Sequence, residues 1–310
     1  MVGGEVSCDG AAARAGGGPL YGSNSRARTM ADPSAFANAA AARSPRPART
    51  AAMPDLPRVT LVTLEATIGA GKSTQLRLLK EAFQNNDSVV FLDEPDAEWE
   101  EHGLINALYS GEIDKCAFQM MALISRVTDL INLVLSGARF IVSERSPLSD
   151  YLVFANANLN GIDLCGYEYC FRKLQALLEK HAVFSVHMVY LNVCCDVAKE
   201  RIASRGRRGE SQDGIPDTYL RILEDAHMDM AKLALSNVAA ARCRGAPESS
   251  LSRLTTRCSV LDGQVDLQTI HAQLVDIIRK ELSSLPCASF DSETLNQLTL
   301  SNMDCHGVVA

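Results

Sequence analysis

Short apolar runs alternate with amphipathic segments along most of the chain from residue 58 onward. The apolar runs are short and rich in β-branched residues, as buried parallel strands are, and they lie at 59–64, 88–92, 139–142, 186–193 and 259–261. The pattern between and after them predicts helices over 73–83, 114–135, 167–181, 197–205 and 216–234. Strands that alternate with helices predict an α/β fold with a mostly parallel sheet.

Three segments depart from this pattern. Residues 1–57 hold six arginines, no lysine and only four acids, and we expect a disordered leader or an organelle transit peptide there. Residues 236–257 are rich in arginine and predict a surface insertion. Periodicity is lost after residue 283, so we expect a folded unit over 58–283 and a frayed tail over 284–310.

Composition narrows the function classes. The net charge of −7 and pI of about 5.4 argue against a general nucleic-acid or anionic-membrane surface. No run of eighteen apolar residues occurs, which argues against a membrane span. The ten cysteines include no C-x-x-C pair, so we expect reduced thiols in an intracellular compartment, either cytoplasm or an organelle.

The strongest motif follows the first apolar run, in the sequence VTLVTLEATIGAGKST at 59–74. Gly69 and Gly71 permit a tight turn whose N–H groups face an anion, Lys72 adds a positive charge, and Ser73 offers a hydroxyl to magnesium. This is the phosphate-binding pattern G-x-x-x-x-G-K-[ST] with Ala66 at the first glycine position, where we expect a near-normal loop. The predicted triphosphate contacts are Thr67, Ile68, Gly69, Ala70, Gly71, Lys72, Ser73 and Thr74.

Charged residues follow the next two strands. Glu94 comes after the second strand, and Glu144 and Arg145 come after the third, followed by Asp150. Ligands of an open parallel sheet bind beyond the carboxyl ends of its strands, so these side chains are expected beside Lys72. A carboxylate there can accept a proton, and an arginine can stabilise a transferring phosphoryl group, although caps and loop ion pairs would use the same residues.

Two further clusters are open to more than one interpretation. Gln119 and Arg126 are seven residues apart and share a helix face beside Phe118, which suits a nucleobase site or a solvated helix edge. Four arginines with two glycines in 201–210 suit a lid that closes on phosphate oxygens or a basic helix end.

Taken together, these pieces resemble the deoxyribonucleoside kinase family, in particular its deoxycytidine/deoxyguanosine branch. The matching segments are EATIGAGKST at 65–74, EPDAEW at 94–99, FQMMALISR at 118–126, ERSPLSDYLVF at 144–154, RIASRGRRGE at 201–210 and DGIPDTYL at 213–220. The resemblance implies a P-loop kinase fold with a five-stranded parallel sheet flanked by helices, a short arginine-rich lid, and transfer from ATP with Mg²⁺ to a deoxyribonucleoside 5′-hydroxyl. It also implies a homodimer through the long helices.

The resemblance assigns roles to individual residues. Glu94 corresponds to the general base, Arg145 to the arginine beside the reacting hydroxyl, and Glu144 with Ser73 to the magnesium site. The remaining matches are the base-pairing Gln119, the stacking Phe118, the pocket wall Trp99, the sugar-binding pair Tyr109 and Glu210, and the lid residues Arg201, Arg205 and Arg207.

Arg126 and Asp150 correspond to a charged pair in family members that accept cytosine or purine bases. Such a pair can bond an exocyclic amino group and would crowd a thymine methyl, so deoxyadenosine, deoxyguanosine and deoxycytidine are favoured over thymidine. Tyr151 and Met121 depart from the family pattern, which has arginine and an aromatic residue at these positions.

Three other functions share features with this sequence and fit it less well. A thymidylate-type monophosphate kinase resembles the chain in fold but needs a cation before the Glu-Pro of the second strand, where the chain has Asp93. A non-catalytic relative in a respiratory-chain complex would not require Lys72, Glu94 and Arg145, which are all present. A GTPase switch lacks its N-K-x-D signal in this sequence.

Overall fold

The computed structural model describes residues 56–206, 215–243 and 255–285. The strands are β1 (Arg58–Glu65), β2 (Val90–Leu92), β3 (Phe140–Glu144), β4 (Val183–Asn192) and β5 (Thr255–Asp262). The longer helices are α2 (Lys72–Ala82), α5 (Lys115–Leu135), α8 (Gly161–Leu178), α9 (Cys195–Arg205), α10 (Asp217–Cys243) and α11 (Leu267–Ser283). Short helices are α3 (Asp96–Glu101), α4 (Leu104–Ser110), α6 (Pro147–Ser149), the π-helix η1 (Asp150–Ala155) and α7 (Asn156–Asn158).

The five strands form one parallel sheet in the order β2-β3-β1-β4-β5. Within it β1 is central, with Leu64 opposite Glu144 on β3 and Glu65 opposite Tyr190 on β4. The carboxyl ends of β1 and β3 therefore lie side by side. The predicted α/β fold with a five-stranded parallel sheet is confirmed.

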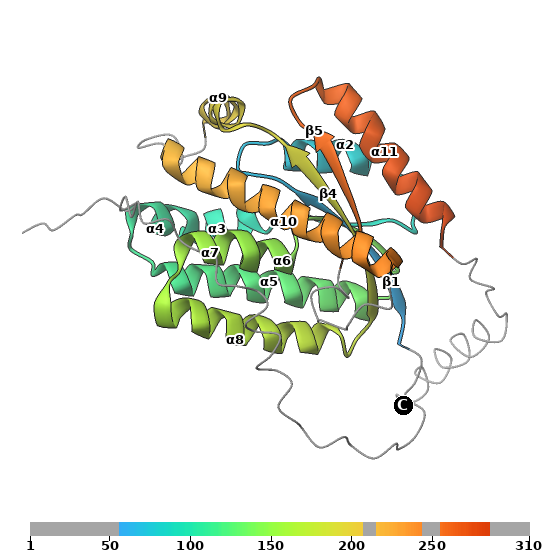
Figure 1. The fold of residues 1–310 in the computed structure, drawn as a ribbon, viewed down its shortest axis with the longest axis horizontal. Coiled ribbons are helices and arrows are strands. Elements are labelled where there is room, and N and C mark those ends of the chain that lie inside the picture. Colours follow the sequence, from blue (N-terminus) through green and yellow to red (C-terminus); the bar gives the residue numbers. More distant parts are fainter. Residues whose placement is uncertain (1–55, 207–214, 244–254, 286–310) are drawn as a thin grey trace, which may run out of the picture.

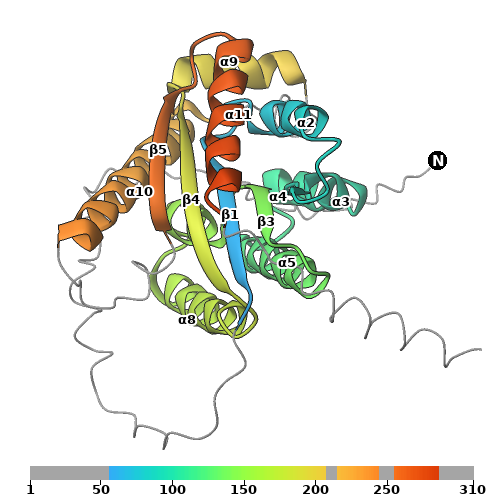
Figure 2. The ribbon, with the colours of Figure 1, turned by 90° about the vertical axis from the view of Figure 1, so that its right-hand side faces the viewer.

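Helices cover both faces of the sheet (Figures 1 and 2). Alternate residues of β1 point to opposite faces: Leu61 packs into the core beneath α5, α8 and α10, and Leu64 into the core beneath α2 and α11. Helix α5 is long and apolar enough to cross a membrane, but Leu123, Val127, Leu130 and Val134 on it pack into the first of these cores, as in the core helix of a globular domain.

Most predicted elements are present, with shifted ends. The third strand continues through Ser143 and Glu144, and α8 begins at Gly161 instead of residue 167. The predicted insertion over 236–257 is wrong at both ends, because α10 continues to Cys243 and β5 begins at Thr255. Helices α3, α4 and α11 were not predicted, although Asp266 caps α11 by accepting hydrogen bonds from the N–H groups of Gln268 and Thr269.

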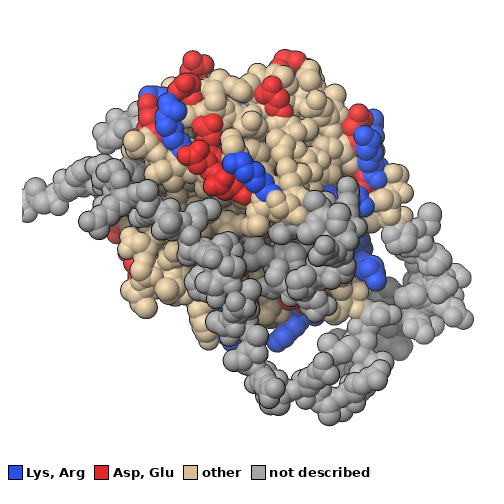
Figure 3. All heavy atoms as spheres, viewed as in Figure 1, with Lys and Arg blue, Asp and Glu red and all other residues tan. Residues whose placement is uncertain are grey.

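Acidic and basic side chains lie next to one another on the face seen in Figure 3. Six cysteines whose side chains the structure describes are unpaired; they are Cys116, Cys165, Cys170, Cys194, Cys195 and Cys258. Residues 1–55 of the predicted leader and 286–310 of the predicted tail lie outside the described residues.

Candidate active site

A cavity of about 590 Å³ lies beyond the carboxyl ends of β1, β2 and β3. It is large enough for two small molecules or one nucleotide-sized ligand, since drug-sized pockets span roughly 300–1,000 Å³. Most of the predicted site residues line it: Ile68, Gly69, Ala70, Gly71, Lys72, Ser73, Thr74, Glu94, Trp99, Tyr109, Phe118, Gln119, Glu144, Arg145, Asp150, Arg201 and Arg205.

The glycine loop joins β1 to α2 and forms one end of the cavity. Gly69 and Gly71 have φ of +77° and +93°, a left-handed conformation that favours glycine. Ala66 is not among the described residues with positive φ, so alanine fits at this position as predicted. Lys72 donates from Nζ to the carbonyls of Ala66 (3.3 Å) and Thr67 (3.1 Å), which holds its ammonium group under the loop. The loop thus places the N-terminus of α2 next to a buried ammonium group, an arrangement that suits an anion.

A serine and a carboxylate stand beside this lysine. Ser73 donates from Oγ to Oε1 of Glu144 at 2.9 Å, and Lys72 Nζ lies 3.9 Å from the same oxygen. Burial raises the pKa of Glu144. A further cation bound nearby would counteract this rise, because it favours the charged carboxylate. Among the described residues no group of three His, Cys, Asp or Glu side chains could hold a metal. The two oxygens suit Mg²⁺, which takes only one or two protein ligands when substrate phosphates supply others.

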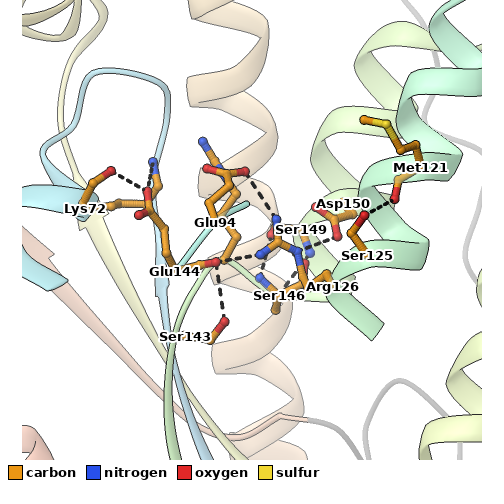
Figure 4. Close-up of polar contacts among 12 residues, drawn as sticks. Lys72, Glu94, Met121, Ser125, Arg126, Ser143, Glu144, Ser146, Ser149 and Asp150 are labelled. Atoms are coloured by element: carbon orange, nitrogen blue, oxygen red, sulfur yellow. Dashed lines mark hydrogen bonds and ion pairs between the residues drawn. The ribbon is translucent and has the colours of Figure 1, made fainter. Parts of the chain in front are cut away.

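Glu94 is held by two arginines, Arg126 and Arg145, and Figure 4 shows its carboxylate beside the Arg126 guanidinium. Arg145 Nε is 3.0 and 3.1 Å from the two carboxylate oxygens, and Arg126 Nη2 is 3.3 Å from Oε1. Burial by itself would raise the pKa of Glu94, but Arg145, Arg126 and Lys72 together lower it to about 2. The carboxylate is therefore ionised and can accept a proton or a hydrogen bond.

Arg145 adopts a strained backbone conformation, with φ of +68°, which no other described non-glycine residue shares. Three contacts hold it there. Its N–H donates to Leu64 (3.0 Å), Nη1 donates to Ala66 (3.0 Å), and its guanidinium lies 4.4 Å from the ring centroid of Phe154. The side-chain contacts hold the guanidinium between Glu94 and the glycine loop.

Lys72 is the third buried cation of this cluster. Burial lowers its pKa, Arg145 lowers it further, and Glu144 and Glu94 only partly compensate, so the pKa is about 8. The ammonium group is thus charged at neutral pH but close to titration in the ligand-free protein.

The far end of the cavity is built by α3, α4 and α5. Trp99 is 6% exposed and meets the ring of Phe118 edge-on at 5.5 Å. Gln119 is 5% exposed and lines the cavity, which excludes the solvated helix edge considered from the sequence. Its amide makes no hydrogen bond to another residue within the described part of the chain, which leaves two donors and an acceptor available to a ligand.

Arg126 and Asp150 form the predicted ion pair, with Arg126 Nε 2.8 Å from Asp150 Oδ2. Burial would lower the pKa of Arg126, but Asp150 and Glu94 raise it, so the guanidinium stays charged. It also donates from Nη1 to the carbonyl of Glu144 at 2.7 Å. Arg126 is 1% exposed and lies behind the cavity wall, so Asp150 is the partner that faces the cavity.

Two predicted lid arginines lie at the loop end. Arg201 donates to the carbonyls of Ala70 and Gly263, both at 3.1 Å, and so links α9 to the glycine loop and to the segment after β5. Arg205 lines the same cavity. Arg207 and Glu210 lie outside the described residues. Thr67 is buried and is not among the residues that line the cavity.

Sequence reasoning missed several residues that line the cavity. Val265 lies just before α11 and Leu267 is its first residue; both border the loop end, and no motif marks them. Asn158 and Tyr219 come from α7 and α10 and share a hydrogen bond of 2.8 Å. Phe154 lies in the segment ERSPLSDYLVF, four residues after Asp150, and that spacing within a helix could have revealed it.

A family model described as deoxynucleoside kinase matches residues 62–285 of the chain. Two solved structures of deoxyadenosine kinase from M. mycoides are also similar. The structure with the products dCMP and dCDP has a TM-score of 0.53 and 19% sequence identity, and the structure with dATP has 0.51 and 20%. Each match covers 71% of this chain and 99% of the other. No curated protein matches the chain by sequence.

Proposed function

The chain belongs to the deoxynucleoside kinase family, and on that premise we propose that it transfers the γ-phosphoryl group of ATP to the 5′-hydroxyl of a deoxyribonucleoside in nucleotide salvage. One observation carries the proposal. The ionised carboxylate of Glu94, held by Arg145 and Arg126, faces the same cavity as Lys72 and the glycine loop. A proton acceptor and a triphosphate-binding loop in one cavity suit transfer of a phosphoryl group from a triphosphate to an alcohol.

The loop end of the cavity suits the donor. The N–H groups of the loop, the N-terminus of α2 and the Lys72 ammonium would hold the β- and γ-phosphates. Arg201 and Arg205 line the same end and would add positive charge to the phosphate oxygens, together with Arg207.

Ser73 and Glu144 would hold magnesium at this end. When bound with ATP, Mg²⁺ neutralises phosphate charge and orients the triphosphate. Since the two oxygens are hydrogen-bonded to each other at 2.9 Å, both are already directed to one point beside the loop.

The acceptor would occupy the end lined by α3, α4 and α5. Gln119 would pair with the base edge, Phe118 would stack on the base, and Trp99 would close the pocket wall. Tyr109, which lines the cavity, and Glu210 would hold the sugar 3′-hydroxyl.

Glu94 would then accept the proton of the 5′-hydroxyl as its oxygen bonds to the γ-phosphorus and the bond from that phosphorus to the β–γ bridging oxygen breaks, which releases ADP. Arg145 would neutralise charge on the transferring group. Arg145 contacts both Glu94 and the carbonyl of Ala66 in the loop, so it connects the proposed general base to the loop that would bind the phosphates of ATP.

For the base, we propose deoxyadenosine, deoxyguanosine or deoxycytidine over thymidine. Asp150 faces the cavity as an acceptor fixed by Arg126, so it favours a base that carries an amino group. A thymine presents a methyl group and a carbonyl oxygen instead, and the carbonyl would be repelled by the carboxylate.

A monophosphate acceptor fits less well. Asp93 has its side chain 61% exposed and paired with Lys80, and it stands where a thymidylate-type kinase would need a cation. It therefore provides no positive charge to bind the phosphate of dTMP.

The test is turnover of the four deoxyribonucleosides and of dTMP by the full chain, with ATP and magnesium. Turnover of deoxyadenosine, deoxyguanosine or deoxycytidine above thymidine supports the proposal. Turnover of dTMP alone would contradict it, and so would no turnover from a folded protein that still binds ATP. In a second arm, Asp150→Asn should reduce the preference for amino-bearing bases over thymidine.

We also propose a homodimer through α5 and α8. Ile162, Tyr169 and Leu177 are exposed at a spacing of seven and eight residues, which places them on one stripe of α8. Ile124 and Leu135 are likewise exposed on one stripe of α5, which packs against α8. Sedimentation of the full chain would measure the mass. The intracellular location stays a prediction.

A further inference from the structure

His227 is a buried histidine next to the candidate active site that none of the roles above uses. It lies on α10, which packs against η1 and β4, and its side chain is 0% exposed. Its Nδ1 is 2.7 Å from the carbonyl of Leu223, so Nδ1 carries the proton and donates it. Within the described residues the Nε2 atom has no hydrogen-bond partner.

The imidazole is neutral. Burial lowers its pKa well below the usual value, and the positive charges of Arg145 and Lys72 lower it further. A charged imidazole would add a positive charge beside these two cations. The ring therefore acts here through shape and aromatic contact.

Two aromatic rings contact the imidazole. The ring of Tyr190, on β4, stacks parallel to it, with an interplanar angle of 4° and centroids 6.2 Å apart. The ring of Phe154, on η1, meets it edge-on, with an angle of 82° and centroids 5.8 Å apart. Such geometries are the favoured ones for aromatic pairs.

Phe154 in turn carries the guanidinium of Arg145 on its face, 4.4 Å from the ring centroid. Phe154 is only half-buried, and one side of it borders the cavity, so the cavity leaves that side of the ring without support. Contacts therefore run from Tyr190 in the sheet through His227 and Phe154 to Arg145 and Glu94.

We propose that His227 is a positioning residue for phosphoryl transfer, and that it fixes the Phe154 ring on which the Arg145 guanidinium rests. Arg145 needs such support because its backbone is strained at φ of +68°. The inference rests on the proposed function only in its kinetic part, because the contacts themselves exist without substrate.

The first test compares His227→Ala with His227→Phe in the full chain. His227→Ala should lower kcat about 10–100-fold, as expected when a catalytic group shifts by about 1 Å, and should change the KM for ATP less than threefold. His227→Phe keeps a ring and should retain kcat within about threefold. A full effect of His227→Phe, or none of His227→Ala, would overturn the proposal.

A double-mutant cycle separates positioning from general destabilisation. In the Arg145→Ala background, His227→Ala should cause no further loss of kcat, because its effect passes through Arg145. Additive losses would overturn the proposal. His187→Ala is the matched control, since His187 is also buried but bonds to Glu281 and Ser259; it should lower stability and leave kcat unchanged.

Crystal structures of the ligand-free wild type and His227→Ala give a readout without turnover. In the variant, the Phe154 ring should rotate and the Arg145 guanidinium should leave its position over it. An unchanged Phe154–Arg145 contact would overturn the proposal. If the wild type phosphorylated no deoxyribonucleoside, the proposed function would fail while this comparison would still decide the positioning role.

Discussion

Glu94 and Asp93 are neighbouring carboxylates with opposite surroundings. Glu94 lies between two buried arginines, whereas Asp93 is exposed and pairs with Lys80 on the surface. Exposed ion pairs contribute little to stability, while a buried carboxylate that bridges two guanidinium groups determines their arrangement.

This difference gives the first prediction. Glu94→Gln should lower kcat by about 10²–10⁴-fold, because the amide cannot accept the proton, with ATP binding nearly intact. Asp93→Asn should change kcat less than about twofold, since this carboxylate is outside the cavity. Steady-state kinetics and ATP titration measure both. Equal activity of Glu94→Gln and wild type would exclude Glu94 as the base.

The second prediction concerns the pH dependence of Lys72. Its pKa of about 8 in the ligand-free protein means that the ammonium loses its proton above that pH, so kcat/KM for ATP should fall about tenfold per pH unit there. The alkaline limb of kcat should lie at higher pH, because bound phosphates favour the charged lysine. A kcat/KM profile that stays flat to pH 9.5 would contradict the assignment.

At the scale of elements, the glycine loop depends on α9. A Cβ atom on Gly69 would lie 2.5 Å from the carbonyl oxygen of Ala198, which belongs to α9. Gly103 has a similar φ of +71°, but nothing lies within 4 Å of a Cβ atom there. Both glycines thus have a left-handed backbone conformation, but only Gly69 lacks space for a Cβ atom.

The third prediction follows from this pair. Gly103→Ala should lower the free energy of unfolding by only about 1–2 kcal/mol, because alanine disfavours the left-handed backbone conformation. Gly69→Ala should lower the free energy of unfolding by more than this, and it should raise the KM for ATP about tenfold or more. The reason is that α9 and Arg201 must shift away from the loop. Urea unfolding and ATP kinetics measure the two effects. Identical behaviour of both variants would show that α9 does not constrain the loop.

At the scale of the whole molecule, two apolar cores hold the sheet between its helix layers. Leu130 of α5 is 1% exposed in one core, and Leu79 of α2 is 0% exposed in the other. The central strand β1 contributes to both cores, so each layer of helices is positioned against the same strand that leads into the glycine loop.

The fourth prediction tests these cores. Leu130→Ala and Leu79→Ala should each lower the unfolding free energy by about 2–5 kcal/mol. Since the sites lie on opposite faces of the sheet, the two losses should add within about 0.5 kcal/mol. Ile222→Ala, at a position 49% exposed on α10, is the control and should change the free energy by less than about 0.5 kcal/mol. Strong non-additivity in denaturant unfolding would indicate coupled cores.

The sequence by itself determined the parallel α/β fold, the glycine loop and most of the cavity-lining residues. These features depend on local patterns. An apolar β-branched run predicts a buried strand, and the loop between Ala66 and Lys72 requires glycines at fixed positions. Residues that follow strand ends, such as Glu94 and Arg145, are predictable because parallel strands end at one edge of the sheet.

Only the tertiary structure decided which groups face the ligand space and which lie behind it. Arg126 and Asp150 are equivalent in the sequence pattern, yet Asp150 faces the cavity and Arg126 is buried behind it by three anchoring contacts. Arg145 follows β3 and Phe154 lies on η1, whereas His227, which contacts the Phe154 ring, comes from α10, far from both in sequence. Their relation arises from packing between layers, which no local periodicity encodes.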